Sequence, residues 1–169
     1  DISDPTNLSL IGSYNTTGTT RSVAISGDYA FVADGSNGMV VLDIANPASP
    51  SLFTTYSTFG YAEDIAIAGD IAYIADTGAG LHIVDITDPA SPVFIQYANT
   101  PGNAISVEID GNYAYVADDA PDIQIIDIEN PASPPFVGTW NVSGTAMDIE
   151  ISGDYAYVAL EEGGLEIGD

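Results

Sequence analysis

The chain has 169 residues, 46% of them hydrophobic, and this proportion excludes an intrinsically disordered polypeptide despite a formal net charge of −24. Acidic residues number 25 against a single cationic one, Arg21, so we expect no nucleic-acid or anionic-membrane partner, because both need Lys or Arg to neutralise phosphate. With no cysteine and no apolar run near the ~20 residues of a membrane-spanning helix, the sequence also excludes disulfides, zinc–sulfur sites and direct membrane insertion.

The chain opens on Asp1-Ile2-Ser3-Asp4-Pro5, and closely related motifs begin at Asp43, Asp85 and Asp127, 42 residues apart each time. A constant period of this length indicates a protein built from copies of one supersecondary unit. Because the chain begins inside the motif, we expect either a processed mature form or a window of a longer array. The units are residues 19–60, 61–102, 103–144 and 145–169.

The first half of each unit predicts a hairpin, as the second unit illustrates. Residues 62–68 alternate in polarity, which is typical of a strand. Gly69-Asp70 follows as a two-residue turn in which glycine supplies a positive φ. Residues 71–75 are apolar on both faces, so we expect this second strand to be buried on both sides.

The second half of the unit predicts two further strands, at residues 81–86 and 93–98, separated by a turn at Asp88-Pro89. Four antiparallel strands in each period match a β-propeller blade, whose relatives have about 40–45 residues. Each such sheet has two apolar faces, so the sheets must pack side by side around an axis. The expected fold is therefore all-β, a four-bladed β-propeller.

Several stretches resemble one known family, namely GDYAYVA, GLHIVDITDPASP, MVVLDIANPASP and IQIIDIENPASP. They are similar to the LVIVD repeat, whose units of about 42 residues are taken to form β-propellers. The resemblance spans essentially the whole chain in four consecutive units. The last unit departs from it at Leu160, where the others have aspartate, and at Gly168, where the others have a large aliphatic residue. The resemblance implies the fold and a cell-surface setting, and it carries no catalytic residue to transfer.

The unit of residues 145–169 lacks a fourth strand, and residues 7–15 match the missing one. We therefore expect a single domain of residues 1–169 in which residues 2–18 complete the last blade and cover its bare edge. The alternative is completion between chains, where the N-terminal strand of one molecule fills the last blade of the next and propagates a filament. A longer array with further blades is a third arrangement.

Acidic loops lie between the second and third strands of each unit, and Asp118, Asp119 and Asp122 form the densest group. Carboxylates of this kind suit Ca²⁺, which takes 6–8 hard oxygen ligands. The loops do not match the EF-hand pattern, so solvated turn residues are the alternative interpretation.

Two further aspartates, Asp64 and Asp148, begin the first strands of alternate units. In a four-bladed ring they would lie on opposite blades near the axis, where they would hold a cation or water. Hydrogen bonding to loop backbone is the alternative role for both side chains.

Three sequons begin at Asn7, Asn15 and Asn141, and the last two share one repeat position near the end of an outer strand. We treat these three as candidate glycosylation sites. Aromatic residues on or near the outer strands are interpreted as packing rather than as a sugar platform.

No catalytic constellation is evident, because His82, which we expect on the surface, has no second histidine, cysteine or lysine to work with. The expected function is a non-catalytic structural or interaction module that is extracellular or on the cell surface. Its expected partners are copies of itself or other surface proteins and glycans, with the repeating subunit of a surface fibre as one form. The alternative is a propeller that binds carbohydrate or a divalent cation on its acidic loop face.

Overall fold

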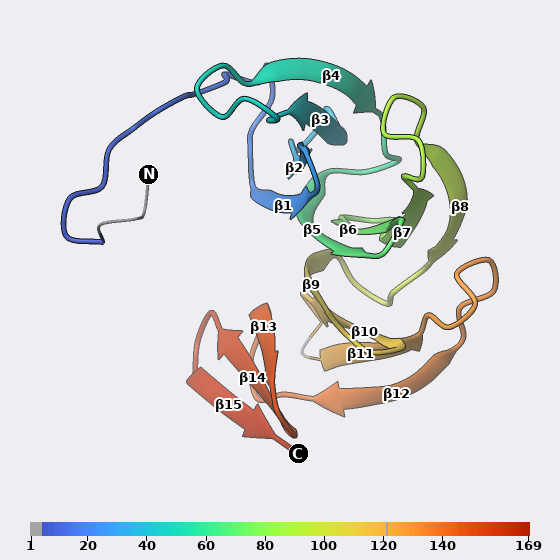
Figure 1. Cartoon of the computed structure of the whole chain (residues 1–169). Helices are drawn as coiled ribbons and strands as arrows, with labels where there is room; N and C mark the ends of the chain where they lie inside the picture. The colour runs from blue at the N-terminus through green and yellow to red at the C-terminus, as the bar shows by residue number, and fades with distance from the viewer. Residues whose placement is uncertain (1–4, 121) are drawn as a thin grey trace.

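The computed structural model describes residues 5–120 and 122–169, and these residues form four antiparallel sheets arranged along an arc (Figure 1). Sheet 1 contains β1 (Ser22–Ser26), β2 (Tyr29–Ala33), β3 (Met39–Asp43) and β4 (Ser51–Tyr56). Sheet 2 contains β5 (Ala62–Ala68), β6 (Ile71–Asp76), β7 (Gly80–Asp85) and β8 (Val93–Ala98). Sheet 3 contains β9 (Ala104–Asp110), β10 (Tyr113–Asp118), β11 (Asp122–Asp127) and β12 (Phe136–Asn141). Sheet 4 contains β13 (Ala146–Ser152), β14 (Tyr155–Leu160) and β15 (Gly164–Gly168).

Within each sheet the strands follow one another in chain order, and the first strand of each sheet lies on the inner side of the arc (Figure 1). The all-β class and the four-strand unit predicted from the sequence are confirmed for sheets 1 to 3. No helix long and apolar enough to cross a membrane occurs in the part of the chain that the structure describes.

The tight turn between the first two strands of each sheet has the predicted glycine in a left-handed conformation. Gly27 has φ 56° and Gly69 has φ 59°, whereas no non-glycine residue among those described has a positive φ. In these turns only the first of the two central residues, the glycine, has a positive φ. This is the signature of a type II′ turn, whose twist matches that of the flanking strands.

The recurring Asp-Ile-x-Asx-Pro motif forms two consecutive side-chain-capped turns at the end of the third strand. In sheet 1, Asp43 Oδ1 accepts a hydrogen bond from the N–H of Ala45 at 3.0 Å, and Asn46 Oδ1 accepts one from Ala48 at 3.2 Å. The same bonds recur in sheets 2 and 3. The motif that defines the period is thus a structural turn, with its side chains used locally.

The apolar cores lie between neighbouring sheets rather than within one central layer. Between sheets 1 and 2, Phe31, Met39 and Val41 pack against Ile65 and Ile74. Equivalent clusters fill the contacts of sheet 2 with sheet 3 and of sheet 3 with sheet 4. Sheets 2 and 3 therefore bury one face against the preceding sheet and the other against the following one, whereas sheets 1 and 4 each bury one face in this way.

The N-terminal segment does not complete sheet 4, contrary to the prediction for residues 2–18. Sheet 4 has three strands, and residues 5–20 form no strand. Gly12 lies against the backbone of Pro47, and the N–H of Gly18 donates to Asp34, so these contacts hold the segment beside sheet 1. Residues 2–4 of the predicted strand lie outside the described residues.

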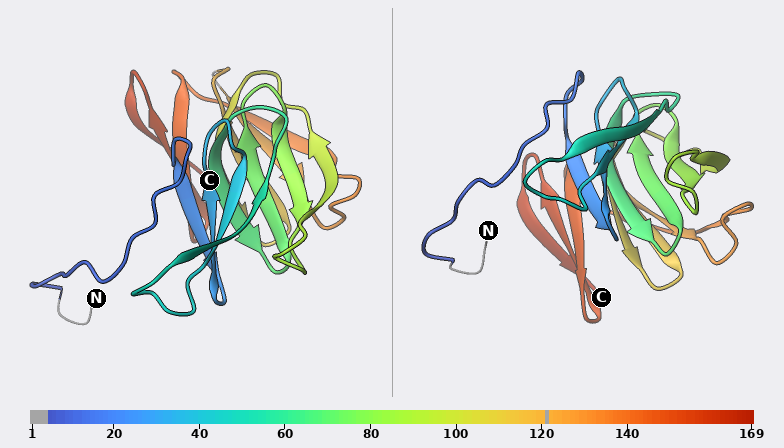
Figure 2. Two further views of the ribbon diagram at one scale, coloured as in Figure 1. Left: turned by 90° about the horizontal axis from the view of Figure 1, so that it is seen from above. Right: turned by 45° about the horizontal axis from the view of Figure 1, so that its top comes forward.

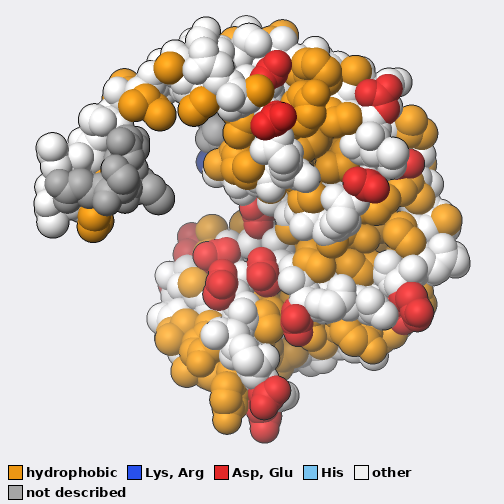
Figure 3. All heavy atoms as spheres, in the orientation of Figure 1, with side chains coloured by type: hydrophobic (Ala, Val, Ile, Leu, Met, Phe, Trp, Pro, Cys, Tyr) orange, Lys and Arg blue, Asp and Glu red, His pale blue; other side chains and the backbone are white. Residues whose placement is uncertain are grey.

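The arc remains open between sheet 4 and sheet 1, so the predicted closed four-bladed ring is not confirmed. Beyond its contacts with sheet 1, the beginning of the described chain projects away from all four sheets (Figures 1 and 2). The space-filling view shows the opening, with acidic side chains gathered beside it on the inner side of the arc (Figure 3). The physical reason is the docking of residues 12–18 on sheet 1, which points the preceding residues away from the edge of β15.

Candidate functional site

A buried aspartate at the end of the second strand holds the loop that leads into each of the first three sheets. The bonds run from the N–H of Gly18 to Asp34 Oδ2 (3.1 Å), of Gly60 to Asp76 Oδ2 (2.9 Å) and of Gly102 to Asp118 Oδ2 (2.9 Å). All three carboxylates are 0% exposed, so the interpretation as solvated turn residues is wrong for them. The constant 16-residue step from glycine to aspartate was the sequence signal for this contact, and Leu160 is its exception.

Asp34 has the richest set of donors among these aspartates. Burial alone would raise the pKa of its carboxyl group, but hydrogen bonds from Thr16, Asn37, Thr20 and Gly18 together hold the pKa below its ordinary value. The closest donor is the hydroxyl of Thr16, at 2.6 Å from Oδ1. The folded chain therefore favours the ionised form of the Asp34 carboxyl group, which binds the backbone N–H of Gly18.

The predicted calcium group of Asp118, Asp119 and Asp122 is divided among separate roles. Asp119 accepts hydrogen bonds from the backbone N–H and the Nδ2 atom of Asn103, at 2.8 and 2.6 Å, which lower its pKa. Asp122 lies opposite Asp118 in the β10–β11 pairing. No three His, Cys, Asp or Glu side chains in the described ranges are gathered so that they could hold a metal ion. Calcium binding at this loop stays a prediction.

Asp64 and Asp148 meet at a serine between them instead of facing each other across a ring. The Oγ atom of Ser106 lies 2.9 Å from Asp64 Oδ2 and 2.9 Å from Asp148 Oδ1. The N–H of Val107 also donates to Asp64 Oδ2, at 2.9 Å. This bond is to the strand backbone of β9 rather than to loop backbone, and it ties together the first strands of sheets 2 and 3.

A polar hollow of about 360 Å³ surrounds these residues on the inner side of sheets 2 to 4. Burial raises the pKa of Glu108 in this hollow, and the charges of Glu150 and Asp64 raise it further. One serine hydroxyl proton can serve only one of the two aspartates at a time. The negative potential of the hollow thus favours a cation or a proton, and a cation or water held by Asp64 and Asp148 stays a prediction.

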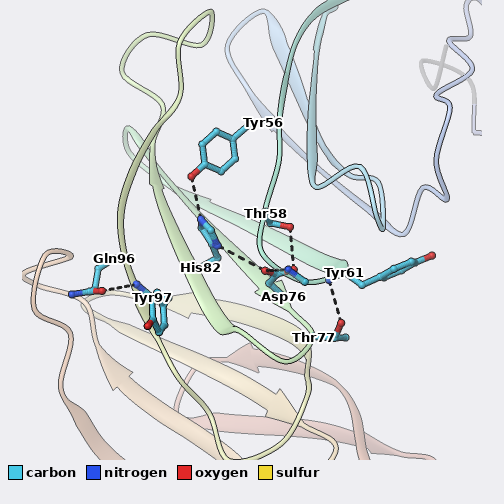
Figure 4. A network of polar contacts seen from close by, with 9 residues as sticks. Tyr56, Thr58, Tyr61, Asp76, Thr77, His82, Gln96 and Tyr97 are labelled. Carbon is cyan, nitrogen blue, oxygen red and sulfur yellow. Dashed lines mark hydrogen bonds and ion pairs between the residues drawn. The ribbon is translucent and has the colours of Figure 1, made fainter.

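His82 is fully buried, so the prediction of a surface histidine is wrong. Its Nε2 atom lies 3.2 Å from the hydroxyl of Tyr56, and its Nδ1 atom lies 3.8 Å from Asp76 Oδ2 with no hydrogen-bond partner (Figure 4). The rings of Phe59 and Phe94 cover it, with centroids 5.2 and 5.1 Å away. These aromatic residues come from neighbouring segments of the chain, which the local pattern around His82 does not reveal.

An aromatic cleft of about 580 Å³ opens between sheets 3 and 4. Its walls include Tyr115, Trp140, Tyr155, Asp110, Asp154 and Asp169. A Cβ atom on Gly168 would approach the Trp140 ring to 3.0 Å, so the departure of the last unit at this position makes room for the indole. The cleft combines aromatic faces with carboxylates, a pairing suited to a polyhydroxylated ligand.

The three sequon asparagines, Asn7, Asn15 and Asn141, all lie exposed on the surface. Asn141 ends β12 opposite Asp122 in the sheet. The three side chains are therefore accessible to modification, and their glycosylation stays a prediction.

The first end of the arc leaves an apolar face of sheet 1 uncovered. Val23 is 56% exposed and Ile25 is 59% exposed. Residues at the position of Val23 in the three later sheets are buried against the preceding sheet, with exposures of 5% at Ile65, 3% at Val107 and 4% at Ile149. The difference arises because no sheet among the described residues packs against this face of sheet 1.

At the other end of the arc, sheet 4 exposes the opposite face of the sheet. Leu165 and Ile167 of β15 are 59% and 56% exposed. The equivalent residues of sheet 1, Met39 and Val41, are 0% exposed because they pack against sheet 2. The two ends of the arc therefore present the two complementary halves of one inter-sheet contact.

Comparison with known proteins identifies both the repeat and the architecture. The LVIVD repeat matches residues 1–16, 17–58, 59–100, 101–142 and 143–169. No match was found among curated proteins. Similar solved structures include the computationally designed protein Ika4, at 9% identity and a TM-score of 0.75, covering 96% of this chain and 98% of that one.

Two larger structures are also similar. The designed protein Ika8 has 9% identity and a TM-score of 0.71, covering 88% of this chain and 45% of its own. The β-propeller domain of Cps50 (Swd1) from Myceliophteria thermophila has 14% identity and a TM-score of 0.69, covering 83% of this chain and 52% of its own. The likeness establishes a β-propeller type of fold, of which this chain spans about half the length in these two cases.

Proposed function

Since this chain belongs to the LVIVD-repeat family along its whole length, we propose that it is a non-catalytic structural or interaction module on the outside of the cell. Its sheets join to copies of itself or to other surface proteins and glycans, and a surface fibre is one form that such joining takes. The observation that carries this proposal is the pair of open apolar faces, at Val23 and Ile25 on one end and at Leu165 and Ile167 on the other. Exposed apolar faces of this kind mark interaction surfaces.

The use of the polar side chains supports a structural role. Asp34, Asp76 and Asp118 clamp backbone, and His82 is enclosed by aromatic rings. These four side chains are thus occupied in holding the repeat together. The net charge of −24 suits an exterior with abundant cations, which screen self-repulsion.

The test is the accessibility of the protein on intact cells that produce it. An antibody against the folded chain should stain these cells without permeabilisation, and mild protease treatment should remove the signal. Because the chain has no lysine, amine-reactive labels are unsuitable. Staining that requires permeabilised cells, or turnover of a substrate by the purified protein, would contradict the proposal.

Carbohydrate binding is a second candidate function, favoured by the aromatic cleft around Trp140. A glycan array and calorimetry with the purified chain would detect saturable binding. Trp140→Ala should abolish it, whereas Tyr97→Ala, on an exposed outer strand of sheet 2, should leave it intact. Equal affinity in both variants would exclude the cleft as the binding site.

Divalent-cation binding is favoured by the hollow where Ser106 bridges Asp64 and Asp148. Calcium should raise the melting temperature more than magnesium at equal ionic strength, and Asp148→Asn should remove the difference. An equal response to the two ions in the parent chain would contradict this role.

A further inference from the structure

We infer that a second copy of this chain covers the open ends of the arc, so that two copies close one ring of eight sheets, four from each. This inference rests on the proposed joining function and names its partner. Each junction would pair the uncovered face of sheet 4 in one copy with the uncovered face of sheet 1 in the other.

The N-terminal segment already follows the course of an outer strand that precedes sheet 1. Gly18 is bonded to Asp34 just as Gly60, which follows the outer strand β4, is bonded to Asp76. The segment nevertheless forms no strand, because no third strand of the described residues lies beside it in a sheet. For residues 12–14, the missing element is a strand equivalent to β3.

Sheet 4 lacks the matching element, since β15 pairs with β14 and with no other strand in the described chain. The family match divides one repeat in the same way, with residues 143–169 at one end and residues 1–16 at the other. One end of the chain thus has three strands of a unit and the other end has the fourth.

The register of the missing pairing follows from sheet 1. There, Met39 pairs with Tyr56 and Val40 with Thr55. Moving β3 forward by three periods and β4 back by one period places Leu165 opposite Tyr14 and Glu166 opposite Ser13. The same register brings the apolar face of β15 against Val23 and Ile25, as in the other inter-sheet contacts.

A second copy is the occupant that the geometry favours. The chain spans about half of the Cps50 propeller, and a propeller is a closed ring, so two arcs of this length complete about one turn. Closure within one chain would require residues 12–14 to leave sheet 1 and the segment before them, which projects away from all four sheets, to cross the opening of the arc to β15 (Figures 1 and 2). A head-to-tail contact that closes after two copies leaves no free end.

The test is disulfide cross-linking. Because the chain has no cysteine, any disulfide must form between the cysteines that are introduced. The double variant Ser13→Cys/Glu166→Cys should, after oxidation, give a covalent product of two chains with no free thiol, since paired strands place such residues within disulfide reach. The control Ser13→Cys/Thr87→Cys moves the second thiol to an exposed turn of sheet 2 and should retain free thiols.

Native mass provides a measurement without the new thiols. The unmodified chain should sediment at twice its mass of 17.5 kDa at about 0.15 M salt, where charge repulsion is screened. Ile25→Asp and Ile167→Asp should each shift it to the monomer mass. Val93→Asp should not, because Val93 is similarly exposed at 57% but lies on the outer strand of sheet 2.

Each other outcome overturns the inference. An internal disulfide in a monomer would show that the chain closes on itself, and a ladder of higher products would show a filament. A monomer with free thiols would show that no second copy joins these ends. None of these results bears on antibody staining of intact cells, so failure of this inference is distinguishable from failure of the proposed function.

Discussion

The backbone N–H of Gly60 donates a hydrogen bond of 2.9 Å to Oδ2 of Asp76, and the carboxylate that accepts it is fully buried. This bond fixes the loop between sheets 1 and 2 to the end of β6. Equivalent bonds occur at Gly18 and Gly102, so one contact, repeated with the period of the sequence, fixes the loops that lead into the first three sheets.

Replacing this carboxylate should destabilise the fold. In Asp76→Ala, the N–H of Gly60 and the hydroxyl of Thr58 lose their acceptor, and we expect a loss of about 1–3 kcal/mol in the free energy of unfolding. Urea denaturation would measure it. Asp70→Ala, in an exposed hairpin turn, should change stability by less than about 0.5 kcal/mol. Similar losses in both variants would show that the buried bond is unimportant.

The close approach of the loop to β6 predicts a strict requirement for glycine at position 60. A Cβ atom there would overlap the backbone carbonyl oxygen of Thr77, so Gly60→Ala should cost more than about 2 kcal/mol through displacement of the loop. Gly138→Ala is the matched control, because its Cβ would meet only the Ile125 side chain at 3.4 Å or more. Thermal melting of the two variants would separate these cases, and equal melting temperatures would contradict the steric argument.

The buried pair of Tyr56 and His82 should show strong coupling. Burial raises the pKa of Tyr56, so its hydroxyl stays protonated at neutral pH and can donate to Nε2 of His82 at 3.2 Å. Tyr56→Phe should cost about 1–3 kcal/mol, since it leaves a buried ring nitrogen without a partner. The double variant Tyr56→Phe/His82→Phe should recover much of the lost stability, because it no longer contains the unpartnered ring nitrogen. A double-mutant cycle with a coupling energy near zero would show that the two side chains act independently.

Stability should fall in acid partly through Asp34. Its pKa is lowered in the folded state by hydrogen bonds, so its contribution is present above the unfolded pKa of about 3.9 and is lost as the pH falls through the lower folded value. Melting temperatures between pH 5 and pH 2 should therefore drop less steeply in Asp34→Asn than in the parent chain, although the variant is less stable at pH 7. Asp70→Asn controls for the loss of one charge. Parallel pH profiles for the parent chain and Asp34→Asn would contradict the prediction.

The regular part of this protein was predictable from its sequence because its determinants are local. The turn at Gly69 needs one positive φ, the strands on either side show their polarity over a few residues, and Pro89 stops a ladder wherever it stands. Period and strand content together predicted a propeller-type fold, and the structural comparisons agree.

The errors came from contacts between residues far apart in the chain. The prediction of a surface position for His82 is wrong because its own strand carries no sign of Phe59, which covers it from the loop between β4 and β5. The alternative interpretation of Asp76 and Asp118 as solvated turn residues is wrong, because the N–H groups that donate to them, those of Gly60 and Gly102, lie 16 residues earlier in the chain. Only the folded chain brings these groups together.

By itself, then, the sequence determined the unit: its length, its four strands, its turns and the alternation that makes both faces of each sheet apolar. Tertiary structure alone decided how many faces are covered and where the ends lie. The physical reason is that pairing a strand with a neighbour depends on which edges meet in space. Docking of Gly12 and Gly18 on sheet 1 holds the segment that was predicted to supply the fourth strand of the last unit away from Leu165 and Ile167, and so leaves the arc open.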